Sequence, residues 1–95
     1  MGTLRGQTAF VTGGGTGIGR AIAIDLAAAG ARVVVCGRRT EPLEETIQAV
    51  SVAGGVASAV ICDLTDPEAI ESCARALLAE HGTIDILINN AGIEE

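Results

Sequence analysis

A glycine-rich turn between an apolar strand and an alanine-rich helix constrains the fold of this chain more than any other stretch. The turn, residues 12–19 with the sequence TGGGTGIG, follows apolar residues 8–11 and opens into residues 20–29. Glycine lets a backbone adopt φ > 0 or lets another group come very close. A helix N-terminus presents unpaired N–H groups and the positive end of the helix dipole. This order of strand, turn and helix therefore predicts a binding site for a diphosphate.

The spacing of the glycines distinguishes this turn from two other phosphate-binding motifs. No frame of the turn fits G-x-G-x-x-G, and no Gly-Lys-Ser/Thr follows that would make a P-loop. The pattern that fits is G-x-x-x-G-x-G, on Gly13, Gly17 and Gly19. Gly13 would allow the tight turn, Gly17 would admit the diphosphate, and Gly19 would let the helix pack close to the sheet. For the motif alone, a tight turn with no ligand stays open as the alternative.

Strand and helix patterns alternate along the rest of the chain. Apolar runs predict strands at 7–12, 31–36, 56–62 and 84–88. Helices are predicted at 17–29, from about residue 41 to the glycines at 54–55, and from the capping box at 65–68 to Gly82. Thr40 and Thr65 are the expected N-caps, with Glu68 reaching back to Thr65. The expected buried faces of the three helices are Ile18, Ile22, Leu26 and Ala29; Leu43, Ile47 and Val50; and Ile70, Cys73, Ala74, Leu77, Leu78 and His81.

The βαβαβαβ order predicts an α/β fold of the Rossmann type, in which helices cover both faces of a doubly wound parallel sheet. The chain would form half of such a sheet, with strand order 3-2-1-4. The order reverses between strands 1 and 4, and a ligand is expected outside the carboxyl ends of the strands at that point. The glycine turn and residues 89–92 would both be delivered there.

Three motifs, in the right order, resemble those of the short-chain dehydrogenase/reductase family. Residues 12–19 look like its cofactor motif, Asp63-Leu64 resembles its adenine contact, and Asn89-Asn90-Ala91-Gly92 looks like its second motif. The resemblance implies an oxidoreductase that transfers hydride between a nicotinamide cofactor and an alcohol or carbonyl substrate. The cofactor contacts that it implies are Gly13, Gly14, Gly15, Thr16, Gly17, Ile18, Gly19, Asp63, Leu64, Asn90, Ala91 and Gly92.

The resemblance also implies individual roles for the later motifs. Asp63 would accept a hydrogen bond from the adenine amino group, although a strand-end acid before a helix cap is the alternative. Residues 90–92 would lie against the cofactor riboses. Asn89 would instead tie the fourth strand to its neighbours, which is a structural role.

The turn after the second strand indicates which cofactor is bound. NAD-binding chains place Asp or Glu there to hold the ribose 2′-OH. Here Gly37 occupies the place, and Arg38 and Arg39 follow it. No carboxylate would repel a 2′-phosphate, and two guanidinium groups could pair with it. We therefore expect NADP(H) rather than NAD(H), with Arg38 as the main contact; solvated turn residues are the alternative.

The chain contains no Tyr and no Lys. In the resembled family the proton relay uses Ser and Tyr-x-x-x-Lys, so no catalytic residue is assigned. We expect residues 1–95 to form one NAD(P)-binding Rossmann domain, truncated before the catalytic and substrate segment, so that the alcohol or carbonyl substrate binds only in a longer parent. Two alternatives stay open: a non-catalytic dinucleotide-binding module, and a subunit of a split enzyme. The latter would be completed by a second polypeptide or by self-association, as a homo-oligomer, across the fourth strand.

Charge, hydropathy and cysteine spacing argue against several classes of partner and ligand. The formal net charge of −6 argues against nucleic acid or an anionic membrane surface as partner. Asp25 and Gly30 interrupt the longest apolar stretch, so no membrane span is expected. Cys36, Cys62 and Cys73 are widely spaced, with no C-x-x-C or Cys/His cluster, and predict no metal site. We expect the three cysteines to act as small apolar side chains in a reducing compartment, and the protein to be cytoplasmic.

Overall fold

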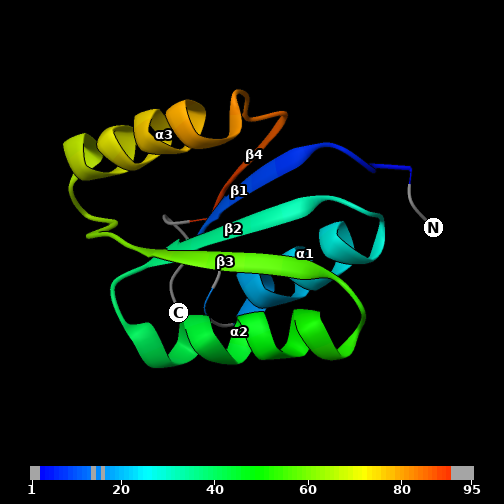
Figure 1. The fold of residues 1–95 in the computed structure, drawn as a ribbon. Coiled ribbons are helices and arrows are strands. Elements are labelled where there is room, and N and C mark those ends of the chain that lie inside the picture. Colours follow the sequence, from blue (N-terminus) through cyan, green and yellow to red (C-terminus); the bar gives the residue numbers. More distant parts are fainter. Residues whose placement is uncertain (1–2, 14, 16, 91–95) are drawn as a thin grey trace.

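The computed structural model describes residues 3–13, 15 and 17–90. Within these residues, strands and helices alternate along the whole chain (Figure 1). The strands are β1 (Thr8–Thr12), β2 (Arg32–Gly37), β3 (Val56–Ile61) and β4 (Ile86–Asn89), and the helices are α1 (Gly17–Ala28), α2 (Thr40–Val52) and α3 (Pro67–His81).

The four strands form one parallel sheet in the order β3-β2-β1-β4, which confirms the predicted half of a Rossmann fold. Val11 of β1 pairs with Val35 of β2 on one side and with Ile88 of β4 on the other. All five residues of β1 are buried. A continuous apolar strand is stable at this central position because helices cover both of its faces.

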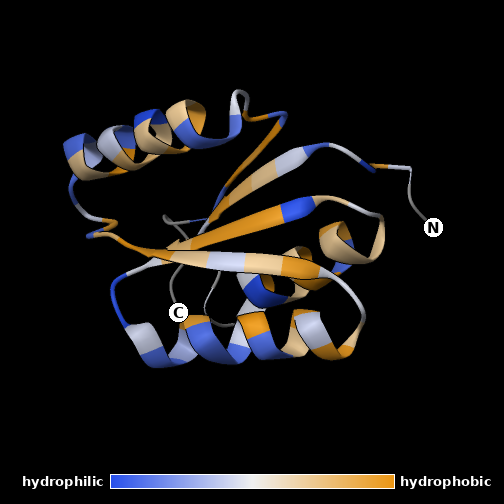
Figure 2. Cartoon of the chain, in the orientation of Figure 1, coloured by the Kyte–Doolittle hydropathy of each residue, from blue (hydrophilic) through white to orange (hydrophobic). Residues whose placement is uncertain are grey.

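The sheet separates two hydrophobic cores. Helices α1 and α2 lie on one face and α3 lies on the other (Figure 1). Figure 2 shows the hydrophobic colour along β2 and β4. Alternate residues of β1 and β2 point to opposite cores, as the two-residue period of a strand requires. The buried residues on the α1/α2 side are Ala9, Val11, Ala23, Ala27, Ala31, Val33, Val35, Leu43 and Val50, and those on the α3 side are Phe10, Val34, Cys36, Cys62 and Leu77.

The prediction for the buried face of α1 was wrong by one position along the helix. Gly19, Ala23 and Ala27 are the buried residues of α1, whereas Ile18 is 56% exposed. The smaller side chains let the helix axis approach the sheet, and the larger apolar residues flank this seam. In α2 a buried Thr46 similarly takes the central place that was expected for Ile47, which packs at the edge of the core.

Two expected N-caps also differ from the structure. Helix α2 already includes Thr40, and Arg39 is its N-cap residue, without a side-chain hydrogen bond to the helix. Helix α3 is capped by Asp66, whose carboxylate accepts a hydrogen bond from the Glu68 N–H at 3.0 Å. Thr65 lies one residue before this N-cap, and its hydroxyl donates to Asp63. Gly82 ends α3 in the left-handed conformation, as predicted.

Candidate dinucleotide-binding site

The glycine turn begins directly at the end of β1. Gly13 has φ = 70°, a conformation that side chains other than glycine rarely adopt. Its N–H donates to the carbonyl oxygen of Cys36, at the end of β2, over 2.8 Å. The turn therefore leaves the sheet at the carboxyl end of β1, next to β4, where the strand order reverses.

Gly19 lies where the first turn of α1 touches the end of the sheet. A Cβ atom on Gly19 would collide with the Gly13 carbonyl oxygen and would lie 2.8 Å from Nδ2 of Asn90. Only a hydrogen atom fits there. The absence of a side chain thus sets how closely the α1 N-terminus approaches both β1 and β4, which is the close-packing role expected for this glycine.

Thr12 joins the carboxyl ends of β1 and β4. Its hydroxyl accepts a hydrogen bond from the Asn90 N–H at 2.9 Å and lies within donating distance of Ile88 O (3.3 Å) and Asn89 Oδ1 (3.2 Å). Asn89 therefore contacts the neighbouring strand, which is the structural role that the sequence predicted for it. Thr12, Asn89 and Asn90 thus connect the two motifs where the strand order reverses.

Asn90 is a buried polar residue of this site. It is 2% exposed, and its Nδ2 donates to the Gly13 carbonyl oxygen over 3.2 Å. Its Oδ1 is buried and accepts no hydrogen bond from the described residues. A buried acceptor without a partner costs about 1–3 kcal/mol. This unpartnered acceptor, on the residue whose Nδ2 packs against Gly19, fits a site that is completed by a bound donor.

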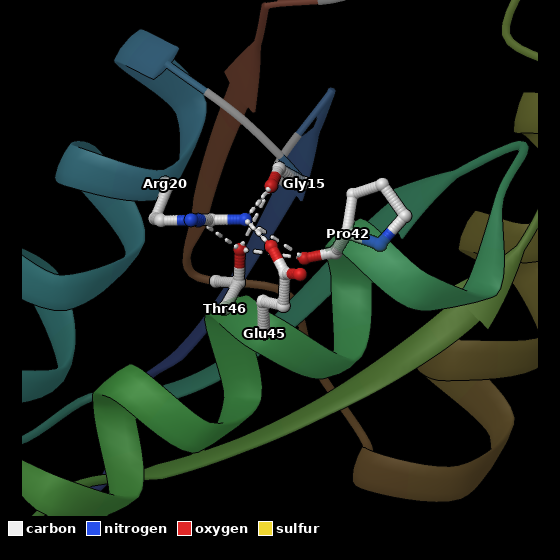
Figure 3. A network of polar contacts seen from close by, with 5 residues as sticks. All are labelled: Gly15, Arg20, Pro42, Glu45 and Thr46. Carbon is white, nitrogen blue, oxygen red and sulfur yellow. Dashed lines mark hydrogen bonds and ion pairs between the residues drawn. The ribbon is translucent and has the colours of Figure 1, made fainter.

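Arg20, in the first turn of α1, connects the glycine turn to α2 (Figure 3). Its guanidinium group donates to the carbonyl oxygens of Gly15 (2.6 Å) and Pro42 (3.2 Å), to Thr46 Oγ1 (3.0 Å) and to Glu45 Oε1 (3.1 Å). The Thr46 hydroxyl lies 3.2 Å from the same Gly15 oxygen. The Thr46 hydroxyl and the Arg20 guanidinium group thus both bind the glycine turn at the Gly15 carbonyl oxygen.

Sequence reasoning missed this network. The only signal for Arg20 was a basic residue at the start of a helix, where a cation is unfavourable to the helix dipole. The signal for Thr46 was a β-branched polar residue on the inner face of α2. Neither observation identifies the partner, because the partners lie up to 31 residues away.

Arg38 and Asp63 lie at the carboxyl edge of β2 and β3. Both are exposed, as is Arg39. Hydrogen bonds from the Thr65 hydroxyl (2.7 Å) and the Thr65 N–H (3.0 Å) hold the pKa of Asp63 below its usual range, and the charge of Arg38 adds to this effect. Among the described residues, neither Arg38 nor Arg39 forms an ion pair. This edge therefore offers an ionised carboxylate and two guanidinium groups to a ligand.

The remaining residues of the predicted site divide into two groups. Gly17 begins α1 with no atom within 4 Å of the place a Cβ would take, and Ile18 is exposed beside it. Gly15 is buried, and Leu64 packs against the α3-side core. The four other predicted contacts lie outside the described residues: Gly14, Thr16, Ala91 and Gly92.

The fold and the two converging motifs define a nucleotide-binding Rossmann domain. A family model described as short chain dehydrogenase matches residues 7–95. The chain belongs to this short-chain dehydrogenase family, as its motifs predicted. In the part that the structure describes, no helix has the length and hydropathy of a membrane-spanning segment.

Named relatives support this assignment. The chain is 45% identical over 89 residues to a fatty acyl-CoA reductase of Acinetobacter baylyi, covering 94% of this chain and 30% of that protein. It is 44% identical to the short-chain dehydrogenase/reductase homolog YusS of Bacillus subtilis, covering 92% of this chain and 81% of that one. A metagenomic short-chain oxidoreductase solved in complex with NADP superposes with a TM-score of 0.83 at 44% identity, covering 87% of this chain and 38% of that chain. The chain thus spans about a third of the length of the reductase and of the solved oxidoreductase.

Proposed function

We propose that this chain forms the NADP(H)-binding part of an oxidoreductase that moves hydride between the nicotinamide cofactor and an alcohol or carbonyl substrate. The observation that carries the proposal is the convergence of Gly13, Gly19 and Asn90 at the α1 N-terminus. A Cβ on Gly19 would collide there with the Gly13 carbonyl oxygen, and Asn90 carries a buried acceptor, Oδ1, without a described partner. The family and the NADP complex of a 44% identical relative support the same assignment.

Different residues of the chain would bind different parts of the cofactor. The diphosphate would bind to the glycine turn at the N-terminus of α1, where free N–H groups and the helix dipole favour an anion. Asp63 stays ionised and would accept a hydrogen bond from the adenine amino group. Asn90 and the residues after it would lie against the riboses. The bound nicotinamide would supply or receive the hydride.

The preference for NADP(H) depends on the end of β2. Gly37 is the last residue of β2, so no acidic side chain stands at this place; a Cβ there would lie 3.3 Å from Cδ2 of Leu43. Arg38 follows, exposed and without an ion-pair partner among the described residues. Charge-assisted hydrogen bonds from this guanidinium group to a 2′-phosphate would contribute about 1.5–3 kcal/mol.

We assign the proton transfer and substrate binding to sequence beyond these 95 residues, which hold neither Tyr nor Lys. Within the described sheet, β4 pairs only with β1, and Leu87 of β4 is 62% exposed. This surface suits a further segment, whether it comes from the same polypeptide or from a second one. The split-enzyme alternative depends on that second possibility.

The proposal is tested by titrating the protein with NADPH and, separately, with NADH. We expect tighter binding of NADPH, and we expect Arg38→Ala to remove most of that preference while leaving NADH binding nearly unchanged. Arg75→Ala is the matched control, because Arg75 forms only a surface pair with Glu71 on α3. Equal affinities of the parent protein for both cofactors would refute the NADP(H) preference, and binding of neither cofactor would refute the cofactor role.

A further inference from the structure

The topology brings the three cysteines of the chain together. Cys36 lies near the end of β2, Cys62 follows β3, and Cys73 lies on α3. The N–H of Cys62 donates to the Gly37 carbonyl oxygen over 2.7 Å, which places Cys62 beside the end of β2, next to Cys36. Helix α3 then covers them, and the three sulfur atoms all lie within 4.8 Å of one another. Their spacing in the sequence gave no sign of this cluster.

The cluster lies in an apolar environment. Cys36 is 0% exposed and Cys62 is 5% exposed, while Cys73 is half-buried. All three belong to the hydrophobic core on the α3 side of the sheet, together with Phe10, Val34 and Leu77. Burial, followed by the neighbouring Cys62 thiol, raises the pKa of both Cys36 and Cys73. Cys36 and Cys73 are therefore neutral thiols at neutral pH.

The distances suit a central atom that is bound by three sulfurs. Metal–sulfur bonds of about 2.3 Å around a trigonal centre would place the sulfur atoms about 4 Å apart. The separations in the structure would need to shorten by less than about 1 Å, which side-chain rotation can supply. Thiolate sulfur is a soft ligand and selects soft, thiophilic partners over magnesium or calcium.

Charge selects among the thiophilic partners. Three thiolates around a divalent cation would leave a net negative charge in this apolar core, where an unpaired charge is costly. A trivalent centre bound by three thiolates is neutral. With arsenous acid the exchange is As(OH)₃ + 3 RSH → As(SR)₃ + 3 H₂O. Three As–O and three S–H bonds break, three As–S bonds form, the protons leave in the water, and no atom changes oxidation state.

We propose that Cys36, Cys62 and Cys73 form a three-thiol binding site for a trivalent thiophilic oxyacid, of which arsenite is the probe, held as a neutral tris-thiolate. The site lies on the α3 side of the sheet and is distinct from the proposed dinucleotide site. It adjoins that site through the backbone, because the Cys36 carbonyl accepts from Gly13 and Cys62 precedes Asp63.

The test uses the full-length protein encoded by the gene, reduced with a phosphine so that no small thiol competes. With added arsenite, native mass spectrometry should show a gain of one arsenic atom less three hydrogen atoms. The melting temperature should rise, because a ligand that binds only the folded state stabilises it. Cys73→Ala, at a half-buried helix position, should keep the fold and lose the three-hydrogen adduct. Loss of groups around a bound metal typically weakens binding by about 10–100-fold, so loss of a ligand should cost at least about 100-fold in arsenite affinity.

Ser72→Ala, at the exposed neighbouring position on α3, is the matched control and should bind arsenite like the parent. Equal arsenite affinity of Cys73→Ala and the parent would overturn the proposal. So would a lower melting temperature, which would indicate binding to the unfolded chain, or the absence of any adduct. Tight binding of Zn²⁺ to the same thiols without binding of arsenite would overturn the charge argument and with it the assignment.

Discussion

The side-chain amide nitrogen of Asn90 lies 3.2 Å from the carbonyl oxygen of Gly13, 77 residues earlier in the chain. This hydrogen bond joins the two motifs that the sequence could only place at the same edge of a sheet. Both atoms are buried, so neither can exchange the partner for water without opening the site. The shape of the glycine turn therefore depends on the end of β4.

Replacing Asn90 by Asp should destabilise the protein strongly. Aspartate has the same shape as asparagine, but a carboxylate oxygen would replace the amide N–H that donates to the Gly13 carbonyl oxygen. The residue is only 2% exposed, so water cannot solvate the new charge. An unpaired buried charge of this kind costs about 3–5 kcal/mol, which urea unfolding would measure. Asn89→Asp is the matched control, since this exposed side chain acts as an acceptor for Thr12 and keeps that role. Equal losses of stability in the two variants would show that the hydrogen bond from Asn90 to Gly13 does not stabilise the fold.

Adding one methyl group at Gly19 should disturb the turn itself. The Cβ of Gly19→Ala would collide with backbone, the Gly13 carbonyl oxygen, rather than with a side chain that can rotate. Overpacking typically costs about 1–3 kcal/mol, and we expect the upper part of that range, with loss of dinucleotide binding. Ala21→Ser, at an exposed position of the same helix, should change neither property. Thermal unfolding and a cofactor titration would check this, and parent-like binding by Gly19→Ala would contradict the geometry.

Arg20 should matter far more than the ion pair that it forms with Glu45. Arg20→Ala removes hydrogen bonds to two backbone carbonyls and to Thr46, and the Gly15 oxygen loses its shortest one. We expect a loss of about 1–3 kcal/mol and weaker cofactor binding. Glu45→Gln touches only an exposed pair, with the acid 69% exposed, and should cost about 0–1 kcal/mol. A double-mutant cycle measured by urea unfolding separates the two contributions, and equal losses would argue against a turn-holding role.

The stability of the reduced, ligand-free chain should fall above pH 9. The ordinary pKa of the Cys36 thiol is 9.0 and burial raises it in the folded state, so above pH 9 only the unfolded chain releases this proton. The contribution of Cys36 is thus fully present below pH 9 and is lost as the pH rises, at up to about 1.4 kcal/mol per pH unit. These 95 residues contain no Tyr or Lys to obscure the effect. Urea unfolding of the parent and of Cys36→Ala on both sides of pH 9 would test it, and parallel pH profiles would refute it.

Local signals predicted much of the fold. The apolar runs, Gly82 at the end of α3 and the alternation of strands with helices led to the observed order β3-β2-β1-β4. Connection rules for parallel sheets restrict the choices so strongly that few others remain. The close contact between residues 13 and 90 follows from the same topology.

Three features could not be predicted from the sequence: the cap of α3, the buried face of α1 and the cysteine cluster. Each depends on how the helices and strands pack in the folded chain. Asp66, not Thr65, caps α3 because the helix begins one residue later than expected, at Pro67, and the Asp66 carboxylate accepts from the Glu68 N–H. The buried face of α1 shifted because small residues allow closer packing than the isoleucines beside them. The cysteine cluster requires β2, β3 and α3 to assemble, so the spacing in the sequence carried no signal of it.

The most direct test of the proposed cofactor site is an amide NMR titration of the protein with NADPH. We expect the largest shifts at Gly13, Gly19, Arg38 and Asp63, at the carboxyl edge of the sheet, and none at Ser72 on the outer surface of α3. Saturating shifts confined to that edge would establish the dinucleotide site. Shifts elsewhere, or a spectrum that NADPH leaves unchanged, would contradict it.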